Sequence, residues 1–170
     1  MKVLVTGGAG YIGSQLVFEL ANNNNVSEIV VYDNLLRNNF NLFISASNKI
    51  NNNKVKFVQG DLLDSRSLNA AMKDVEIVYH LAAVTNSGYK SLNSDIFEQT
   101  NHWGTAEVIY AAEEAGTVKQ FVYASSTGVY QGGKDILCDE ESTLNPRDYY
   151  SISKMRGEEH VARLQDSSYC

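Results

Sequence analysis

The sequence predicts an α/β domain with a doubly wound parallel sheet, and three observations support this fold class. Apolar runs with little polar alternation recur along the 170 residues, as in parallel strands that helices cover on both faces. Segments with helical apolar spacing separate these runs. The first run, Val3–Val5, leads into glycines at positions 7, 8, 10 and 13. The chain therefore opens with a buried strand, a glycine turn and a helix.

The glycines after the first strand predict a binding site for phosphate groups. Gly7 permits a tight turn, Gly10 lets the backbone approach a pyrophosphate, and Gly13 lets helix and strand pack closely. A helix is expected to begin at about Tyr11, where the free N–H groups of its first turn and its dipole favour an anion. The apolar residues expected to face the strand recur at every fourth position: Ile12, Leu16 and Leu20.

An acidic residue follows the second apolar run at an informative distance. Ile29–Tyr32 leads into Asp33, which lies 20 residues after Gly13. At this spacing a carboxylate at the end of the second strand accepts hydrogen bonds from the adenosine ribose hydroxyls. These features together predict dinucleotide binding. Asp33 would repel a 2′-phosphate, which favours NAD over NADP, whereas Arg37 is able to reach such a phosphate and keeps NADP as the alternative.

Length and composition indicate one ordinary globular domain. The 14 Lys and Arg residues against 20 Asp and Glu give a net charge of −6 without a basic tract, so neither nucleic acid nor an anionic membrane is expected as the main partner. Without a leading apolar segment or a bilayer-spanning run, a cytoplasmic location is expected. Cys138 and Cys170 are expected to be thiols, and no pattern of metal ligands is present.

Apolar spacing and turn residues predict the remaining elements. The expected strands after the second are Lys54–Gln59, Glu76–His80 and Gln120–Ala124. The expected helices are Leu42–Lys49, Ser65–Met72, Asp95–Ala115 with Gly116 as its stop, and a helix entered at Asp148 that continues to about Leu164.

Polar and small residues follow the third and fourth strands, where a doubly wound sheet presents its ligand crevice. Asp61 either accepts a hydrogen bond from the adenine amino group or caps the next helix. His80 is expected to be a hydrogen-bonded structural residue rather than a catalytic base. Leu81, Ala82 and Ala83 come next, where bulk would collide with a bound cofactor.

Candidate catalytic groups lie near the fifth strand and in the last helix. Hydroxyl side chains in Ser125–Tyr130 stand beside the crevice, where they can bind a substrate oxygen. Tyr150 and Lys154 are four residues apart and share one helical face. A nearby ammonium favours the tyrosinate and lowers the phenol pKa from about 10, so Tyr150 becomes a proton-transfer group. Asn101 is expected to bond the backbone of a neighbouring strand.

These motifs together resemble those of the extended short-chain dehydrogenases/reductases, in the nucleotide-sugar epimerase/dehydratase branch. In the family's order they are Thr6–Gly13, Asp33, Gly60–Leu62, His80–Ala83, Asn101 with Gly104 and Thr105, Ser125–Tyr130, and Tyr150 with Lys154. The resemblance covers nearly the whole chain. It implies a Rossmann fold with strand order 3-2-1-4-5, NAD as the cofactor and a nucleotide sugar as the substrate.

The resemblance also implies individual residue roles. Tyr150 is the acid/base, Lys154 lowers its pKa and holds the nicotinamide ribose, and Ser126 hydrogen-bonds the reacting sugar oxygen. Asp33 holds the adenosine ribose, and Asn101 has a structural place. The residues expected to contact the cofactor are Gly7, Gly10, Tyr11, Ile12, Gly13, Asp33, Asn34, Asp61, Leu62, Leu81, Ala82, Ala83, Tyr150 and Lys154.

The implied reaction is hydride transfer from a sugar carbon to NAD while Tyr150 removes the hydroxyl proton, and return of the hydride to the opposite face inverts the centre. Dehydratases of this branch carry an acidic pair where this chain has Thr127 and Gly128, so an epimerase or a simple reductase is expected rather than a dehydratase. The alternatives are a dehydrogenase or reductase of another carbonyl substrate, a sugar-nucleotide dehydratase, and a non-catalytic NAD-binding protein. Gln131 stands where the family has glycine.

Family members continue past this last helix with a sixth strand and a C-terminal substrate domain. The chain ends at Cys170, so residues 1–170 are expected to be the NAD-binding domain of a longer parent enzyme, itself expected to be a homodimer. Without the sixth strand, the fifth would form an exposed sheet edge that favours association.

Overall fold

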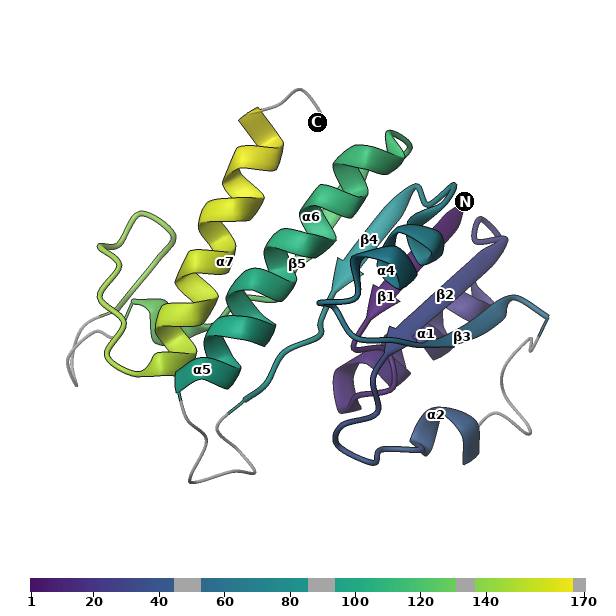
Figure 1. The fold of residues 1–170 in the computed structure, drawn as a ribbon, viewed down its shortest axis with the longest axis horizontal. Coiled ribbons are helices and arrows are strands. Elements are labelled where there is room, and N and C mark those ends of the chain that lie inside the picture. The colour runs from purple at the N-terminus through teal and green to yellow at the C-terminus, as the bar shows by residue number, and fades with distance from the viewer. Residues whose placement is uncertain (45–52, 86–93, 131–136, 167–170) are drawn as a thin grey trace.

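The computed structural model describes residues 1–44, 53–85, 94–130 and 137–166, and five parallel strands form its sheet (Figure 1). The strands are β1 Lys2–Thr6, β2 Glu28–Asp33, β3 Val55–Gln59, β4 Ile77–His80 and β5 Gln120–Tyr123. Their order is β3-β2-β1-β4-β5, which confirms the predicted fold class and topology. Thr6 pairs with both Tyr32 and His80, so the carboxyl ends of the central strands share one edge.

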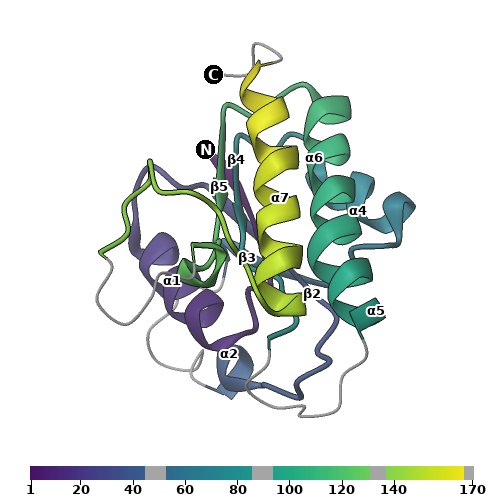
Figure 2. The ribbon, with the colours of Figure 1, turned by 90° about the vertical axis from the view of Figure 1, so that its left-hand side faces the viewer.

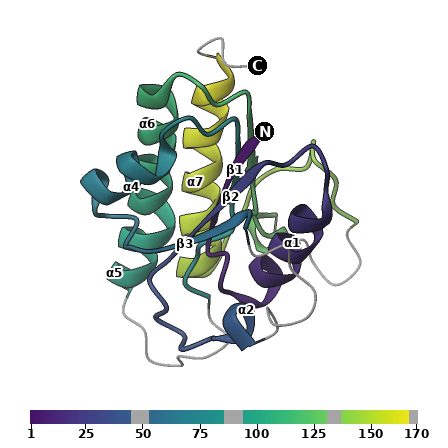
Figure 3. The same cartoon turned by 90° about the vertical axis from the view of Figure 1, so that its right-hand side faces the viewer.

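Helices cover both faces of the sheet, with α1 on one face and α4, α6 and α7 on the other (Figures 2 and 3). The helices are α1 Tyr11–Asn22, α2 Asn41–Ile44, α4 Ser65–Met72, α5 Ser94–Phe97, the π-helix η1 Glu98–Trp103, α6 Gly104–Ala115, the 3-10 turn η2 Thr127–Val129 and α7 Tyr149–Asp166. The predicted helix Leu42–Lys49 lies mostly outside the described residues, and α2 matches its start.

Two hydrophobic cores form because successive side chains of a strand point to opposite faces. Leu4 of β1 belongs to the core under α4 and α6, which also contains Leu68, Val78 and Val108. Val3 and Val5 belong to the core under α1, with Val17, Ile29 and Val31 as further members. Apolar strands buried on both faces explain the unbroken apolar runs in the sequence.

The side of α1 that faces the sheet differs from the prediction. Ile12 is 68% exposed, whereas Val17 and Ala21 are buried together with Gly13 and Ser14. Leu16 and Leu20 pack only at the margin of the core. The contact between Gly13 and the glycine turn sets the rotation of the helix, because a Cβ at Gly13 would lie 2.6 Å from the Cα of Gly8.

The predicted long helix Asp95–Ala115 is present, but a π-helical segment interrupts it. α5, η1 and α6 follow one another directly from Ser94 to Ala115, and Gly116 ends the run with φ 63°. The spacing of apolar residues gave no sign of the π segment. Such segments are frequent at functional sites, and this one carries the buried Asn101.

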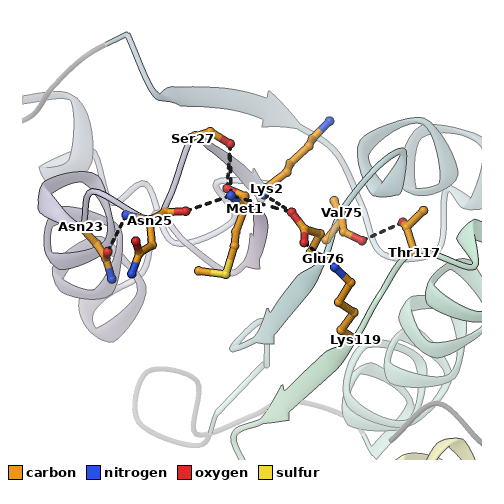
Figure 4. A network of polar contacts seen from close by, with 9 residues as sticks. All are labelled: Met1, Lys2, Asn23, Asn25, Ser27, Val75, Glu76, Thr117 and Lys119. Atoms are coloured by element: carbon orange, nitrogen blue, oxygen red, sulfur yellow. Dashed lines mark hydrogen bonds and ion pairs between the residues drawn. The ribbon is translucent and has the colours of Figure 1, made fainter.

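Figure 4 shows a polar network at the amino edge of the sheet, opposite the glycine turn. The Met1 ammonium lies 3.8 Å from the Glu76 carboxylate and donates to the Asn25 carbonyl oxygen at 2.9 Å. Lys119 reaches the same carboxylate at 2.8 Å. This network ties β1, β4 and β5 together at their starts. In the part of the chain that the structure describes, no helix is both long and apolar enough to cross a bilayer.

Candidate active site

A cleft of about 500 Å³ opens at the carboxyl edge of the sheet. Every residue that the sequence assigned to the cofactor lines this cleft, from Gly7 at the end of β1 to Lys154 in α7. Ser126 does not line it, although its neighbour Ser125 does. Thr85 and Thr100 also line the cleft without an assigned site role, and so does Arg37, the residue considered for contact with a 2′-phosphate. The topology brings these segments together because all five strands point their carboxyl ends at one edge.

The glycine turn has the shape expected of a phosphate-binding loop. Gly7 has φ 68°, and a Cβ there would lie 2.6 Å from the Ala82 backbone nitrogen, so a side chain is excluded by conformation and by space. Gly10 lines the cleft as the N-cap of α1, with no side-chain cap on the helix. A Cβ at Gly10 would meet the Gly7 carbonyl at 3.1 Å and nothing else within 4 Å beyond its own chain neighbours and helix. The open space beside Gly10 fits a pyrophosphate.

The backbone fixes the Asp33 carboxylate at the end of β2. One of its oxygens accepts from the Ala9 N–H at 3.1 Å, and the other accepts from the Leu35 N–H at 2.8 Å. Each carboxylate oxygen keeps a further acceptor position. Asp33 lines the cleft beside the glycine turn, so these free positions suit a ribose diol. The residues present therefore fit an adenine dinucleotide.

The structure tests whether Asp61 caps the helix that follows β3. Asp61 accepts from the Asn34 side chain at 3.2 Å and from the Leu63 N–H at 3.0 Å. The N-cap of α4 is instead Asp64, which accepts from the Ser67 N–H at 3.2 Å. The helix-capping alternative for Asp61 is therefore wrong, because the cap lies three residues later.

Arg37 crosses the cleft. Its guanidinium donates to the Thr85 hydroxyl, which lies beyond the end of β4. In the prediction, Arg37 was the residue that kept NADP open as an alternative. In the structure its charge is directed across the cleft toward β4, where it opposes the rise of the Tyr150 pKa that burial causes.

His80 has the structural role that was expected. Its ring is fully buried between two hydroxyls, with Nδ1 2.6 Å from Thr6 Oγ1 and Nε2 2.9 Å from Thr105 Oγ1. Burial, together with the charge of Lys154, lowers the pKa of His80 to about 3. The imidazole is therefore neutral at physiological pH, and it links β1, β4 and α6.

Asn101 also has the predicted structural role. Its amide accepts from the Val84 N–H at 2.8 Å and donates to the Val84 carbonyl at 2.9 Å, which closes a pair of bonds with the segment after β4. It also donates to the Ser153 hydroxyl in α7 at 3.0 Å. Asn101 therefore holds the last helix beside the cleft.

Ser126 and Tyr150 lie together at the sheet edge. The Ser126 hydroxyl accepts from the Gly128 N–H at 3.2 Å and caps η2. Burial raises the pKa of the Tyr150 phenol, while a hydrogen bond with the Ser126 side chain and the charge of Arg37 act in the opposite direction. The prediction that Lys154 lowers the pKa of Tyr150 is therefore wrong. In the structure the opposing groups are Ser126 and Arg37, because the Lys154 ammonium lies elsewhere, over an aromatic ring.

Lys154 is almost completely buried. The residue is 2% exposed. Burial lowers the pKa of the Lys154 ammonium to about 8, and the charge of Glu158 opposes this shift. The ammonium lies 4.3 Å from the centre of the Tyr123 ring. Glu158, one turn later in α7, accepts from the Ser125 hydroxyl. The sequence reasoning missed Tyr123 and Glu158, because neither belongs to the motifs that it used.

The chain matches known proteins over nearly its whole length. The model of the NAD dependent epimerase/dehydratase family matches residues 3–169. A dTDP-D-glucose 4,6-dehydratase from Mus musculus is 37% identical over 164 residues, which cover 92% of this chain and 44% of the relative. A UDP-glucose 4-epimerase from Pasteurella multocida is 36% identical over 166 residues, covering 94% of this chain and 47% of the relative. The chain spans about half the length of the curated relatives it matches.

Solved structures show the same fold. The UDP-Glc/GlcNAc 4-epimerase from Campylobacter jejuni aligns with a TM-score of 0.86 at 26% identity, over 98% of this chain and 50% of the other. The UDP-glucuronic acid 4-epimerase from Bacillus cereus, solved in complex with NAD, aligns with a TM-score of 0.83 at 26% identity, over 98% of this chain and 53% of the other. The chain therefore belongs to the NAD-dependent epimerase/dehydratase family.

Proposed function

We propose that this protein is an NAD-dependent nucleotide-sugar 4-epimerase, or the part of one that binds NAD and carries the acid/base. The relatives support the substrate class, since their names specify UDP- and dTDP-hexoses and chemistry at position 4. Tyr150, Ser126 and Lys154 are the residues that we assign to the reaction. When bound, NAD supplies the acceptor and donor of the hydride.

The chain's own residues handle the proton. In its ionised form, the Tyr150 oxygen takes the proton of the sugar hydroxyl as the hydride leaves the carbon, and it returns the proton when the hydride comes back to the opposite face. The Ser126 hydroxyl, which is hydrogen-bonded to Tyr150, keeps that phenol oriented and binds the sugar oxygen. The buried Lys154 supplies positive charge at the cleft wall. The groups that oppose the rise of the Tyr150 pKa, and so favour the tyrosinate, are Ser126 and Arg37.

The packing around Gly128 supports epimerisation over dehydration. Dehydration needs an acidic residue beside the reacting carbons, and the dehydratase branch carries a pair of acids at positions 127 and 128. A Cβ at Gly128 would overlap Ser151 Oγ and would lie 3.3 Å from Ser126 Oγ. Ser151 is itself held in place, because its N–H and hydroxyl each donate to the Asp148 carboxylate at 2.9 Å. This packing leaves no room for a carboxylate at position 128.

Product analysis tests this proposal. The protein is incubated with NAD and either UDP-glucose or dTDP-glucose, and the sugar is followed by proton NMR. We expect the 4-epimer to form and expect Tyr150→Phe to lower the rate by about a thousandfold or more with the NAD dissociation constant nearly unchanged. A 4-keto-6-deoxy product would identify a dehydratase. NAD binding without turnover of either sugar would identify this chain as the NAD-binding part of the enzyme, whereas an unchanged rate in Tyr150→Phe would contradict the proposal.

A further inference from the structure

Tyr123 lies in β5 directly against α7, the helix that carries Tyr150 and Lys154. Its ring centre is 4.3 Å from the Lys154 ammonium nitrogen. Its hydroxyl donates to the Lys154 carbonyl oxygen at 3.3 Å. One aromatic side chain thus contacts both the charged group and the backbone of the same lysine.

The aromatic face compensates for the burial of the lysine. An ammonium loses hydration when it is buried, and the negative face of an aromatic ring recovers part of that loss. The groups around Lys154 differ in charge. Glu158 in α7 is the acid that favours its charged form. His80 in β4 stacks on the Tyr123 ring, with 5.6 Å between the ring centres, and is neutral. Burial raises the pKa of Tyr150, so without bound cofactor that phenol is also uncharged.

Tyr123 also determines how closely α7 approaches the sheet. Gly157 lies one turn after Lys154, and a Cβ there would overlap the Tyr123 hydroxyl and lie 2.9 Å from the ring carbon that bears it. The helix can pack at this distance only because residue 157 has no side chain. Burial also raises the pKa of the Tyr123 phenol, so Tyr123 remains a neutral ring.

We propose that Tyr123 is a positioning residue, whose aromatic face holds the Lys154 ammonium charged at the wall of the cleft and whose hydroxyl seats α7 on β5. The inference rests on the proposed function, in which Lys154 supplies positive charge at the cleft wall. It adds a residue outside the motifs, and it assigns the electrostatic support of Lys154 to a neutral ring in addition to Glu158.

A matched pair of ring variants tests this role by NMR titration of the lysine. The chain is labelled with ¹³C and ¹⁵N in lysine, and Lys154→Arg assigns the resonance of Lys154. Tyr123→Phe keeps the aromatic face, whereas Tyr123→pentafluorophenylalanine has nearly the same shape with the charge distribution of its face reversed. We expect Lys154 to titrate near pH 8 in the wild type and in Tyr123→Phe, and about one pH unit lower in the fluorinated variant.

Equal titration midpoints in the two ring variants would overturn the proposal. A second readout needs no substitution, because the Tyr123 ring current is expected to shift the ε-methylene protons of Lys154 upfield of those of exposed lysines. Resonances at the ordinary lysine position would also overturn it. Both measurements are made without NAD or sugar, so they stand or fall independently of whether the product analysis supports an epimerase.

Discussion

The two edges of the sheet are built from different chemistry. At the amino edge, charged groups pair with one another: Lys2 lies 3.2 Å from Glu28, and Glu76 contacts both Met1 and Lys119 (Figure 4). At the carboxyl edge, the Asp33 carboxylate accepts from backbone N–H groups and keeps acceptor positions toward the cleft. The amino edge therefore satisfies its charged groups internally, whereas the Asp33 carboxylate at the carboxyl edge keeps acceptor positions for a ligand.

The largest expected effect comes from crowding the glycine turn. In Gly13→Ala the new methyl group would overlap the Gly7 carbonyl oxygen and lie 2.6 Å from the Gly8 Cα, so the turn must shift. We expect NAD to bind about 5- to 150-fold more weakly, because overpacking destabilises the NAD-binding conformation of the turn by about 1–3 kcal/mol. Calorimetric titration measures this, with Glu76→Gln at the amino edge as the control. An unchanged NAD affinity in Gly13→Ala would show that the carboxyl edge is not the edge that binds the ligand.

The next largest effect is expected from removing the hydrogen bonds of Asn101, which hold α7 beside the cleft. Asn101→Ala leaves the buried Val84 N–H and carbonyl without their partner and breaks the bond to Ser153. We expect the free energy of unfolding to fall by about 2 kcal/mol. Chemical denaturation measures this loss. A variant as stable as the wild type would show that the network does not hold α7.

A pH effect is expected from His80. The unfolded imidazole takes up a proton below about pH 6.5, whereas the buried ring has its pKa lowered to about 3. Between these values the unfolded state binds more protons, so stability present above pH 6.5 is lost as the pH falls toward 3, by up to about 1.4 kcal/mol per pH unit. Denaturation at several pH values measures the slope. His80→Asn is expected to flatten it, and an unchanged slope would assign it to other groups.

The smallest effect is expected at the amino edge. Glu76→Gln weakens the pairs with Met1 and Lys119, which are partly exposed and therefore contribute little to stability. We expect a slightly lower melting temperature, with a difference that shrinks in high salt. NAD affinity is expected to stay within about twofold. A large loss of NAD affinity would show that the two edges are coupled.

The order of elements and the cleft residues were predictable because they depend on local patterns that repeat along the chain. The glycine turn follows directly after one apolar strand, Asp33 lies 20 residues after Gly13, and the Tyr150–Lys154 spacing is one helical turn. The exposed Ile12 was not predictable, because a spacing of four fits several neighbouring faces and tertiary contact at Gly13 selects one. The roles of Tyr123 and Arg37 depend on contacts between distant segments, which no local pattern specifies. Gln131 lies outside the described residues.

A calorimetric titration of the 170-residue chain with NAD and, separately, with NADP tests the cofactor site directly. We expect NAD to bind at the carboxyl edge and NADP to bind more weakly, because Asp33 lines the cleft beside the glycine turn and would repel a 2′-phosphate there. Gly13→Ala is expected to weaken NAD binding, and Glu76→Gln is expected to leave it unchanged. A folded chain that binds no NAD, or that binds NADP equally well, would contradict the proposed cofactor site.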